Sequence, residues 1–205
     1  MVILAINSAS FTGRLALINE QKVVEEKHWK ACNNESEYLL PAIIELLKVS
    51  DLGFNDLDKI VVISGPGPFT ALRVSIAVAN TLAYALNKPV VGVSLMEYWK
   101  NIYKGDFILN AGQNRIFYKN VIIDFDEFLR EFDIKKELSG ELREDQIEKI
   151  KKAGIKWIDV ENLPSFGQAV LTLAQNNFKG YDEKEIVAPL YFSAPQITKS
   201  TKTYK

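Results

Sequence analysis

The sequence predicts an α/β protein built on a sheet of mixed strand direction. Three short apolar runs follow one another at residues 2–6, 14–18 and 22–29, and the polar segments between them have the composition of turns. Beyond this meander, segments with helical periodicity alternate with apolar, strand-like segments up to residue 95. With 205 residues, 47% of them hydrophobic and 25% charged, the chain can bury one large domain or two small lobes.

The first predicted helix spans residues 36–48, and the sequence leaves its start open. Asn34 with Glu37 three residues later forms a capping-box pattern, whereas Pro41 fits a helix only in its first turns and moves the start towards Tyr38. Leucine and isoleucine follow at helical spacing on almost every side: Leu39, Leu40, Ile43, Ile44, Leu46 and Leu47. A helix without a polar face is usually buried on more than one side, so we expect a partner surface here.

The most informative segment is Gly-Pro-Gly-Pro-Phe-Thr at residues 65–70, which joins a strand at residues 59–64 to a helix that ends near residue 86. A strand that turns directly into a helix exposes backbone amides that suit an anion or a nucleotide phosphate. The residues of such a site would be Gly65, Gly67, Thr70 and Arg73. The alternative, which the local sequence favours, is a tight turn with Thr70 as the helix cap. The sequence contains neither a Walker loop nor a Gly-x-Gly-x-x-Gly motif.

The helix after this turn carries a small residue at every fourth position: Ala71, Ser75, Ala79 and Ala83. Such a stripe lets another element approach closely, either a partner helix or the sheet of the same chain. Together with the apolar first helix, it predicts a surface for another protein. The residues that we assign to this partner interface are Ser36, Leu39, Leu40, Ile43, Leu72, Ser75, Ile76, Ala79 and Ala83.

The chain divides at residue 95, where the alternation of long helices and buried strands ends. We expect residues 1–95 to form one lobe, residues 96–195 a second and smaller lobe, and residues 196–205 a disordered tail. In the second lobe the pattern predicts strands at 107–110, 115–123 and 155–160, surface helices within 124–152, and a last helix over 166–178. The sequence shows no internal repeat with a period of about 20–50 residues.

Composition excludes several kinds of site. Lys and Arg total 25 against 26 Asp and Glu, and this net charge of −1 argues against nucleic-acid binding by bulk charge. The single cysteine, Cys32, excludes an internal disulfide and a multi-cysteine zinc site. The single histidine, His28, has no evident third group that would orient it towards Cys32, so we do not expect a catalytic dyad. Metal ligands are therefore not assigned.

Targeting signals are also missing from the sequence. The apolar run at residues 1–6 is short and has no basic segment before it, unlike a signal peptide. Polar residues interrupt the longest apolar stretch, residues 74–95, so a membrane span is not expected. We expect a cytoplasmic protein.

Several of these segments resemble the TsaB (YeaZ) family, accessory subunits of bacterial tRNA threonylcarbamoyladenosine synthesis. Residues 65–75 follow the family signature Gly-Pro-Gly-Ser-Phe-Thr-Gly-Leu-Arg-Val-Gly, with departures at Pro68, Ala71 and Ser75. Residues 35–41 match His-Ser-Glu-x-Leu-Leu-Pro, with a glutamate in place of the histidine. The resemblance is close over the first 95 residues and looser beyond them.

Three weaker matches support the resemblance. Asn7-Ser8-Ala9 stands where the family has Asp-Thr-Ser, and an asparagine cannot supply the negative charge with which actin-like ATPases hold magnesium. Residues 110–117 are an eroded form of Asp-Ala-Arg-x-x-Glu-Val-Tyr. The closing Pro-Leu-Tyr is present at residues 189–191.

The resemblance implies an actin/Hsp70-like fold of two ribonuclease-H-like lobes, the second of them reduced. It implies a non-catalytic subunit that dimerises with a TsaD-type paralogue, through helices that correspond here to residues 36–48 and 70–86. A TsaE-type ATPase as third partner, a homodimer of the isolated chain, and ADP or ATP at the complex interface stay open, while tRNA is contacted only indirectly. The alternatives are an actin-like nucleotide hydrolase, a peptidase, or a self-associating structural protein.

Overall fold

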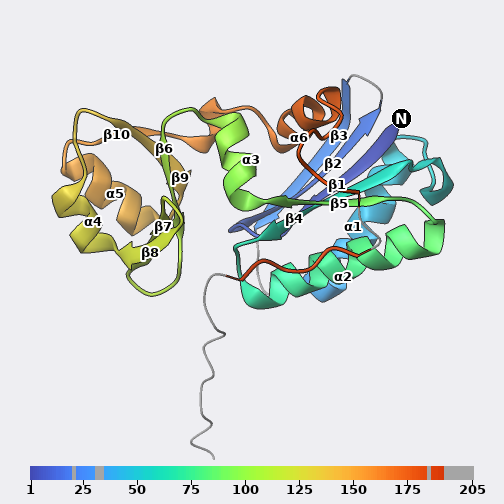
Figure 1. The fold of residues 1–205 in the computed structure, drawn as a ribbon, viewed down its shortest axis with the longest axis horizontal. Helices are drawn as coiled ribbons and strands as arrows, with labels where there is room; N and C mark the ends of the chain where they lie inside the picture. Colours follow the sequence, from blue (N-terminus) through green and yellow to red (C-terminus); the bar gives the residue numbers. More distant parts are fainter. Residues whose placement is uncertain (20–21, 31–34, 184–185, 192–205) are drawn as a thin grey trace, which may run out of the picture.

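The computed structural model describes residues 1–19, 22–30, 35–183 and 186–191. It confirms the α/β class and divides the strands between two five-stranded sheets (Figure 1). The strands of the first sheet, sheet A, are β1 (Val2–Asn7), β2 (Thr12–Asn19), β3 (Lys22–Lys30), β4 (Lys59–Gly65) and β5 (Val90–Ser94). They lie in the order β3-β2-β1-β4-β5. The strand β2 is antiparallel to both neighbours, and β1, β4 and β5 are parallel, so the sheet has the predicted mixed direction.

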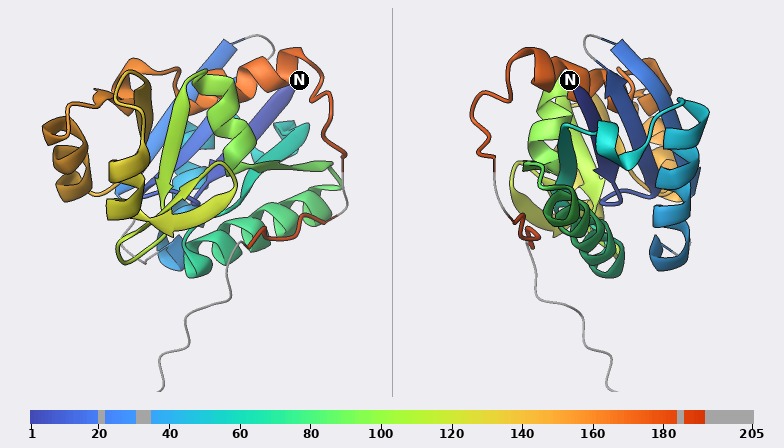
Figure 2. Two further views of the ribbon diagram at one scale, coloured as in Figure 1. Left: turned by 60° about the vertical axis from the view of Figure 1, so that its left-hand side comes forward. Right: turned by 90° about the vertical axis from the view of Figure 1, so that its right-hand side faces the viewer.

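Helices cover both faces of sheet A. One face carries α1 (Glu35–Val49) and α2 (Phe69–Leu86), which also contact each other, and the other carries α3 (Leu95–Ile102) and α6 (Phe166–Gln175) (Figures 1 and 2). Parallel strands that are covered on both sides read as continuous apolar runs. In agreement, β1 and β4 are buried along almost their whole length. This three-layer arrangement forms the main core.

The helix α1 begins at Glu35, nearer the first of the two starts that the sequence left open. Asn34, the expected cap, lies outside the described residues. Pro41 lies inside the helix, but its side chain is exposed, so the ring does not disturb the packing on the sheet. The helix α2 is the one helix of the described ranges whose length and apolar composition would suit a membrane span. Its packing against sheet A accounts for that composition.

The second sheet, sheet B, repeats the topology of sheet A on a smaller scale. Its strands are β6 (Asp106–Asn110), β7 (Arg115–Tyr118), β8 (Val121–Asp124), β9 (Glu137–Glu141) and β10 (Lys156–Ile158). Their order is β10-β9-β6-β7-β8, with β7 antiparallel to its neighbours and β6, β9 and β10 parallel. The helices α4 (Phe125–Glu131) and α5 (Glu144–Lys152) stand in the chain where α1 and α2 stand in the first lobe. The second lobe has a hydrophobic core of its own.

The structure corrects the sequence-based elements of the second lobe in two places. The expected strand over 115–123 is broken by Lys119 and Asn120, both with positive φ, and becomes the hairpin β7–β8. The expected run of surface helices is interrupted by β9, where Gly140 has a φ of 150° and a Cβ would lie 1.9 Å from the carbonyl oxygen of Ile108. The close approach of β6 therefore requires a glycine inside this strand.

The division at residue 95 also needs correction, because three later segments pack on the first lobe. The helix α3 follows β5 directly and packs on β4 and β5, and α6 packs on β2 and β3. Glu26 of β3 holds the start of α6 by accepting hydrogen bonds from the hydroxyl of Ser165 and, at 3.0 Å, from the backbone nitrogen of Gly167. Residues 186–191, here called the strap, run along α2 (Figure 1). The predicted tail, residues 196–205, lies outside the described residues.

Short 3₁₀ helices complete the described part of the chain. These are η1 (Phe54–Asp56), before β4, and η2 (Val160–Asn162), between β10 and α6.

Candidate functional site

Backbone atoms from two other segments of the chain pack directly against the Gly-Pro-Gly turn. A Cβ on Gly65, whose φ is 116°, would lie 2.5 Å from the carbonyl oxygen of Leu190 in the strap. A Cβ on Gly67 would lie 2.5 Å from the carbonyl oxygen of Ala9 in the β1–β2 turn. Both glycines are therefore required by close backbone approach. The expected cap is wrong, because α2 begins at Phe69 with Pro68 at the cap position and no side chain hydrogen-bonds there.

The strap is fastened to the start of α2. The rings of Phe69 and Tyr191 stack at 4.6 Å, and the Arg73 guanidinium lies 4.0 Å from the centre of the Phe69 ring. The Arg73 Nε donates a hydrogen bond of 3.0 Å to the hydroxyl of Tyr191. In the middle of α2, the side chain of Asn80 bonds both backbone groups of Val187, each at 2.9 Å. Arg73, predicted to contact an anion, instead holds the strap.

The position that bears an acid in actin-like ATPases is occupied by a buried asparagine. The Asn7 Oδ1 accepts a hydrogen bond of 2.9 Å from the backbone nitrogen of Ala9, and its Nδ2 lies 3.4 Å from the hydroxyl of Ser10. The side chain thus shapes the β1–β2 turn. The described ranges contain no group of three or more His, Cys, Asp or Glu residues that could hold a metal.

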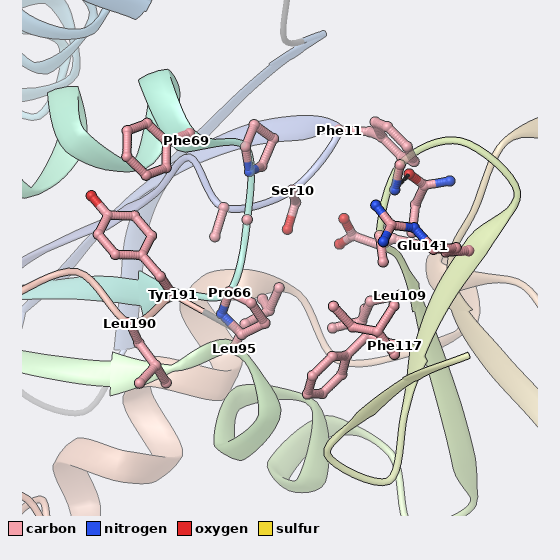
Figure 3. A pocket seen from close by; sticks show the side chains of 18 residues that line it. Ser10, Phe11, Pro66, Phe69, Leu95, Leu109, Phe117, Glu141, Leu190 and Tyr191 are labelled. Carbon is pink, nitrogen blue, oxygen red and sulfur yellow. Dashed lines mark hydrogen bonds between the residues drawn. The ribbon is translucent and has the colours of Figure 1, made fainter. Parts of the chain in front are cut away.

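An open cavity of about 400 Å³ lies between the lobes (Figure 3). In Figure 3, Phe69 and Tyr191 stand on one side of it, and Phe11, Leu109 and Glu141 stand on the other. Of the four residues predicted to bind an anion, only Gly67 lines this cavity; Gly65, Thr70 and Arg73 do not. The structure therefore does not gather the four around one space.

A buried ion pair joins the two lobes beside this cavity. The Arg14 guanidinium on β2 lies 3.0 Å from the Glu141 carboxylate on β9, and the two side chains are only 16% and 10% exposed. Burial alone would lower the pKa of Arg14, but Glu141, with smaller effects of Tyr98 and Glu26, raises it above its ordinary value. Burial also raises the pKa of the Tyr98 hydroxyl to about 12, against the opposing effect of Arg14. The Arg14 guanidinium therefore stays positively charged at every physiological pH.

A second cavity, of about 490 Å³, shares Glu141 with the first. It is more polar and includes Arg14, Glu26 and His28. His28 is exposed on the edge strand β3. Cys32, the other half of the dyad considered above, lies outside the described residues.

Most of the predicted partner interface is inside the molecule. Seven of the nine residues are buried in the core of the first lobe: Leu39, Ile43, Leu72, Ser75, Ile76, Ala79 and Ala83. The small-residue stripe packs towards sheet A, which is the alternative that the sequence left open. The periodicity identified which face of each helix is buried, but not that the chain's own sheet A covers it. Of the nine, only Ser36 and Leu40 are exposed.

The outer face of α1 and α2 nevertheless carries accessible apolar side chains, of which the predicted interface includes only Leu40. They are Leu40, Ile44 and Val49 on α1 and Tyr84 on α2. Tyr84 is 89% exposed and Ile44 is 49% exposed. The two helices pack side by side, and these four residues on them are together called the outer helix face.

Comparison with known proteins finds similar sequences, among them a transferase family and two TsaB proteins. The family model of TsaD, tRNA N6-adenosine threonylcarbamoyltransferase, matches residues 29–107. The protein "tRNA threonylcarbamoyladenosine biosynthesis protein TsaB" of Bacillus subtilis is 39% identical over 97 residues, 47% of this chain and 42% of that protein. The protein of the same name from Buchnera aphidicola subsp. Schizaphis graminum is 25% identical over 92% of this chain and 88% of its own length. The best-matching segment thus spans less than half of the Bacillus relative.

A solved structure extends the likeness to the whole fold. YeaZ from Pseudomonas aeruginosa superimposes with a TM-score of 0.67 over 93% of this chain and 99% of its own, at 18% sequence identity. At 18% identity, this match shows a similar fold and nothing about function. It confirms a two-lobed α/β fold like that of YeaZ, as the resemblance implied.

Proposed function

Because the chain belongs to the TsaB/YeaZ family, we propose that it is an accessory subunit of tRNA threonylcarbamoyladenosine synthesis that binds a TsaD-type transferase. In this proposal the outer helix face of the first lobe docks on the partner, and the chain supplies no reacting group of its own. The transferase, not this chain, would act on the tRNA.

The outer helix face is the observation that carries the proposal. Large apolar side chains on two adjacent helices are costly to leave in water, and such patches often mark protein interfaces. In the second lobe, by contrast, the exposed Val121 and Ile134 lie on an edge strand and in a loop. A docking surface is therefore better supported on the first lobe than on the second.

The similarity to TsaD supports the choice of partner. The matched residues 29–107 include both helices of the outer helix face. Two paralogous lobes can present the same face to each other, as the subunits of a two-fold dimer do. A transferase with a similar lobe would therefore offer a complementary pair of helices. A second copy of this chain would compete for the same face.

The accessory role is supported by the chemistry of the β1–β2 turn. Asn7 has no negative charge and uses both polar atoms inside the turn. A hydrolase of the actin-like type would need a carboxylate for its metal. The assay that separates the roles is turnover of ATP and of a peptide by the purified chain, which the proposal predicts to be absent.

The binding test uses the full chain and the TsaD-type transferase of the same organism, with the dissociation constant measured by calorimetry. Replacing Ile44 and Tyr84 together by arginine is expected to weaken binding by about a hundredfold, since central apolar contacts contribute about 2 kcal/mol or more. The matched control is Ile134→Arg, which adds the same charge at an exposed apolar site of the second lobe. Equal affinity of the double variant and the wild type would contradict the outer helix face as the interface.

Light scattering of the isolated chain tests the competing self-association. The proposal allows a homodimer only if the same double variant abolishes it and the transferase displaces it. A homodimer that persists in the presence of the transferase would favour a self-associating structural protein.

A further inference from the structure

Arg115 is a cation without a partner in the interlobe cavity. It lies at the start of β7 and lines the cavity, and its Nε is buried without a hydrogen-bond partner in the described part of the chain. Within the same residues, its guanidinium forms no ion pair at 4.0 Å or less. A buried donor without an acceptor is costly, and a guanidinium is well suited to pair with a carboxylate or a phosphate.

The acids closest to Arg115 along the sheet or the cavity wall have other partners. Asp124 is directly opposite Arg115 in the β7–β8 register, but its carboxylate caps α4 by accepting from the backbone nitrogens of Asp126 and Glu127, at 2.9 and 3.1 Å. Glu141 lines the same cavity, but its carboxylate pairs with Arg14. Arg115 therefore remains the uncompensated charge of the cavity among the described residues.

The polar amide on the same wall is also occupied. The Asn110 Nδ2 donates to Gln146 at 3.1 Å, and its Oδ1 accepts from the backbone nitrogen of Gly112 at 2.9 Å. Neither group needs a ligand, so the polar recognition that the cavity offers is concentrated at Arg115.

The remaining walls are largely apolar. Three parts of the chain supply them: the first lobe, the second lobe and the strap. Their largest apolar members are Phe11, Phe69, Leu95, Leu109, Phe117 and Leu190. A volume of about 400 Å³ lies within the usual range of small-molecule sites.

We propose that this cavity binds a small carboxylic acid with an aromatic or aliphatic body, whose carboxylate pairs with the Arg115 guanidinium. A carboxylate matches the planar fork of one guanidinium with two parallel hydrogen bonds. A phosphate dianion would keep a second charge in a space with apolar walls, where an unpaired charge is costly. The same reasoning disfavours a nucleotide triphosphate. The inference goes beyond partner docking and does not rest on it.

The test is a calorimetric titration of the full chain with four probes: hydrocinnamate, its neutral amide hydrocinnamamide, inorganic phosphate, and ATP with magnesium. We expect the wild type to bind hydrocinnamate about tenfold more tightly than the amide, because a hydrogen bond to a charged group contributes more than a neutral one. Arg115→Met should remove this difference and leave the affinity for the amide unchanged. Retained amide binding also shows that the variant is folded and its cavity intact.

Two further variants complete the design. Arg115→Lys keeps the charge but not the fork, and should recover part of the preference for the acid. Arg130→Met is the matched control, because Arg130 is exposed on α4 and does not line the cavity. The proposal is overturned if hydrocinnamate binds no better than its amide, if Arg115→Met leaves the preference intact, or if phosphate or ATP binds more tightly than hydrocinnamate.

Discussion

The two lobes share one strand order but differ in how much helix they carry. In the first lobe, α1 and α2 have 15 and 18 residues and cover strands of 5 to 9 residues. In the second, α4 and α5 have 7 and 9 residues on strands of 3 to 5. An 18-residue helix is about 27 Å long, so it can bury one face on the sheet and still present an extended outer face. Long helices thus give the first lobe a surface for a partner, while the short helices of the second mainly close its own core.

We expect the largest loss of stability from a charge on the buried face of α2, and almost none from the same charge on its exposed face. Ala79→Arg would place a charge against sheet A at a position with 0% exposure, and should cost more than about 4 kcal/mol of unfolding free energy. The variant should be insoluble or unfolded at room temperature by circular dichroism. The control is Ala77→Arg, on the exposed side of the same helix, which should stay within about 0.5 kcal/mol of the wild type. A folded Ala79→Arg protein would mean that α2 does not pack as described.

The Arg14–Glu141 ion pair between the lobes predicts an intermediate effect on stability. Glu141→Gln leaves Arg14 largely buried without a carboxylate, which should cost about 3 kcal/mol in urea unfolding. The double variant Arg14→Met, Glu141→Gln should be less destabilised than the sum of the two single variants, because the charge left unpaired is removed as well. Glu148→Gln is the control, since its ion pair with Lys152 on α5 is exposed and should contribute little. If the losses of unfolding free energy in the two single variants add up to the loss in the double variant, Arg14 and Glu141 are not coupled.

At alkaline pH, titration of Tyr98 should lower the free energy of unfolding by a smaller amount than these substitutions do. Its pKa is about 12 in the folded chain and about 10 in the unfolded one, so the unfolded state loses its proton first as the pH rises. The stabilisation is complete below pH 10 and is lost between about pH 10 and 12, for a total of about 2–3 kcal/mol. Tyr98→Phe should flatten this part of the stability profile.

Absorbance titration of the phenolate measures the same effect directly. Burial also raises the pKa of Tyr103 and Tyr181, so a shallower slope should persist in the Tyr98→Phe variant. Tyr84→Phe, at an exposed position on α2, is the control for the removal of one phenol. If the wild type and Tyr98→Phe lose the same free energy of unfolding at alkaline pH, the Tyr98 phenol is not buried as described.

The sequence predicted the first lobe well because its elements are long and buried. Strands such as β4 read as continuous apolar runs, and α1 and α2 show clear helical periodicity. The second lobe was predicted less completely because its strands have only 3 to 5 residues, and because β9, Glu-Leu-Ser-Gly-Glu, has a single large apolar residue. The helix α3 was missed although Ser94 and Glu97 form a capping box that could have indicated its start.

The functional surfaces were harder to predict than the fold. Periodicity marks the apolar face of a helix, and in α2 that face, including Ala79, is buried against sheet A. The exposed Tyr84 carries no periodic signal. The cavity at Arg115 is formed by segments far apart in the chain, from the β1–β2 turn to the strap, and no local pattern contains it.

Hydrogen exchange of the chain, alone and with the TsaD-type transferase of the same organism, tests the proposed docking most directly. We expect slower exchange in peptides from α1 and α2 when the partner is present, and unchanged exchange in α4, α5 and the β7–β8 hairpin. Protection confined to the second lobe, or no protection at saturating partner, would contradict it.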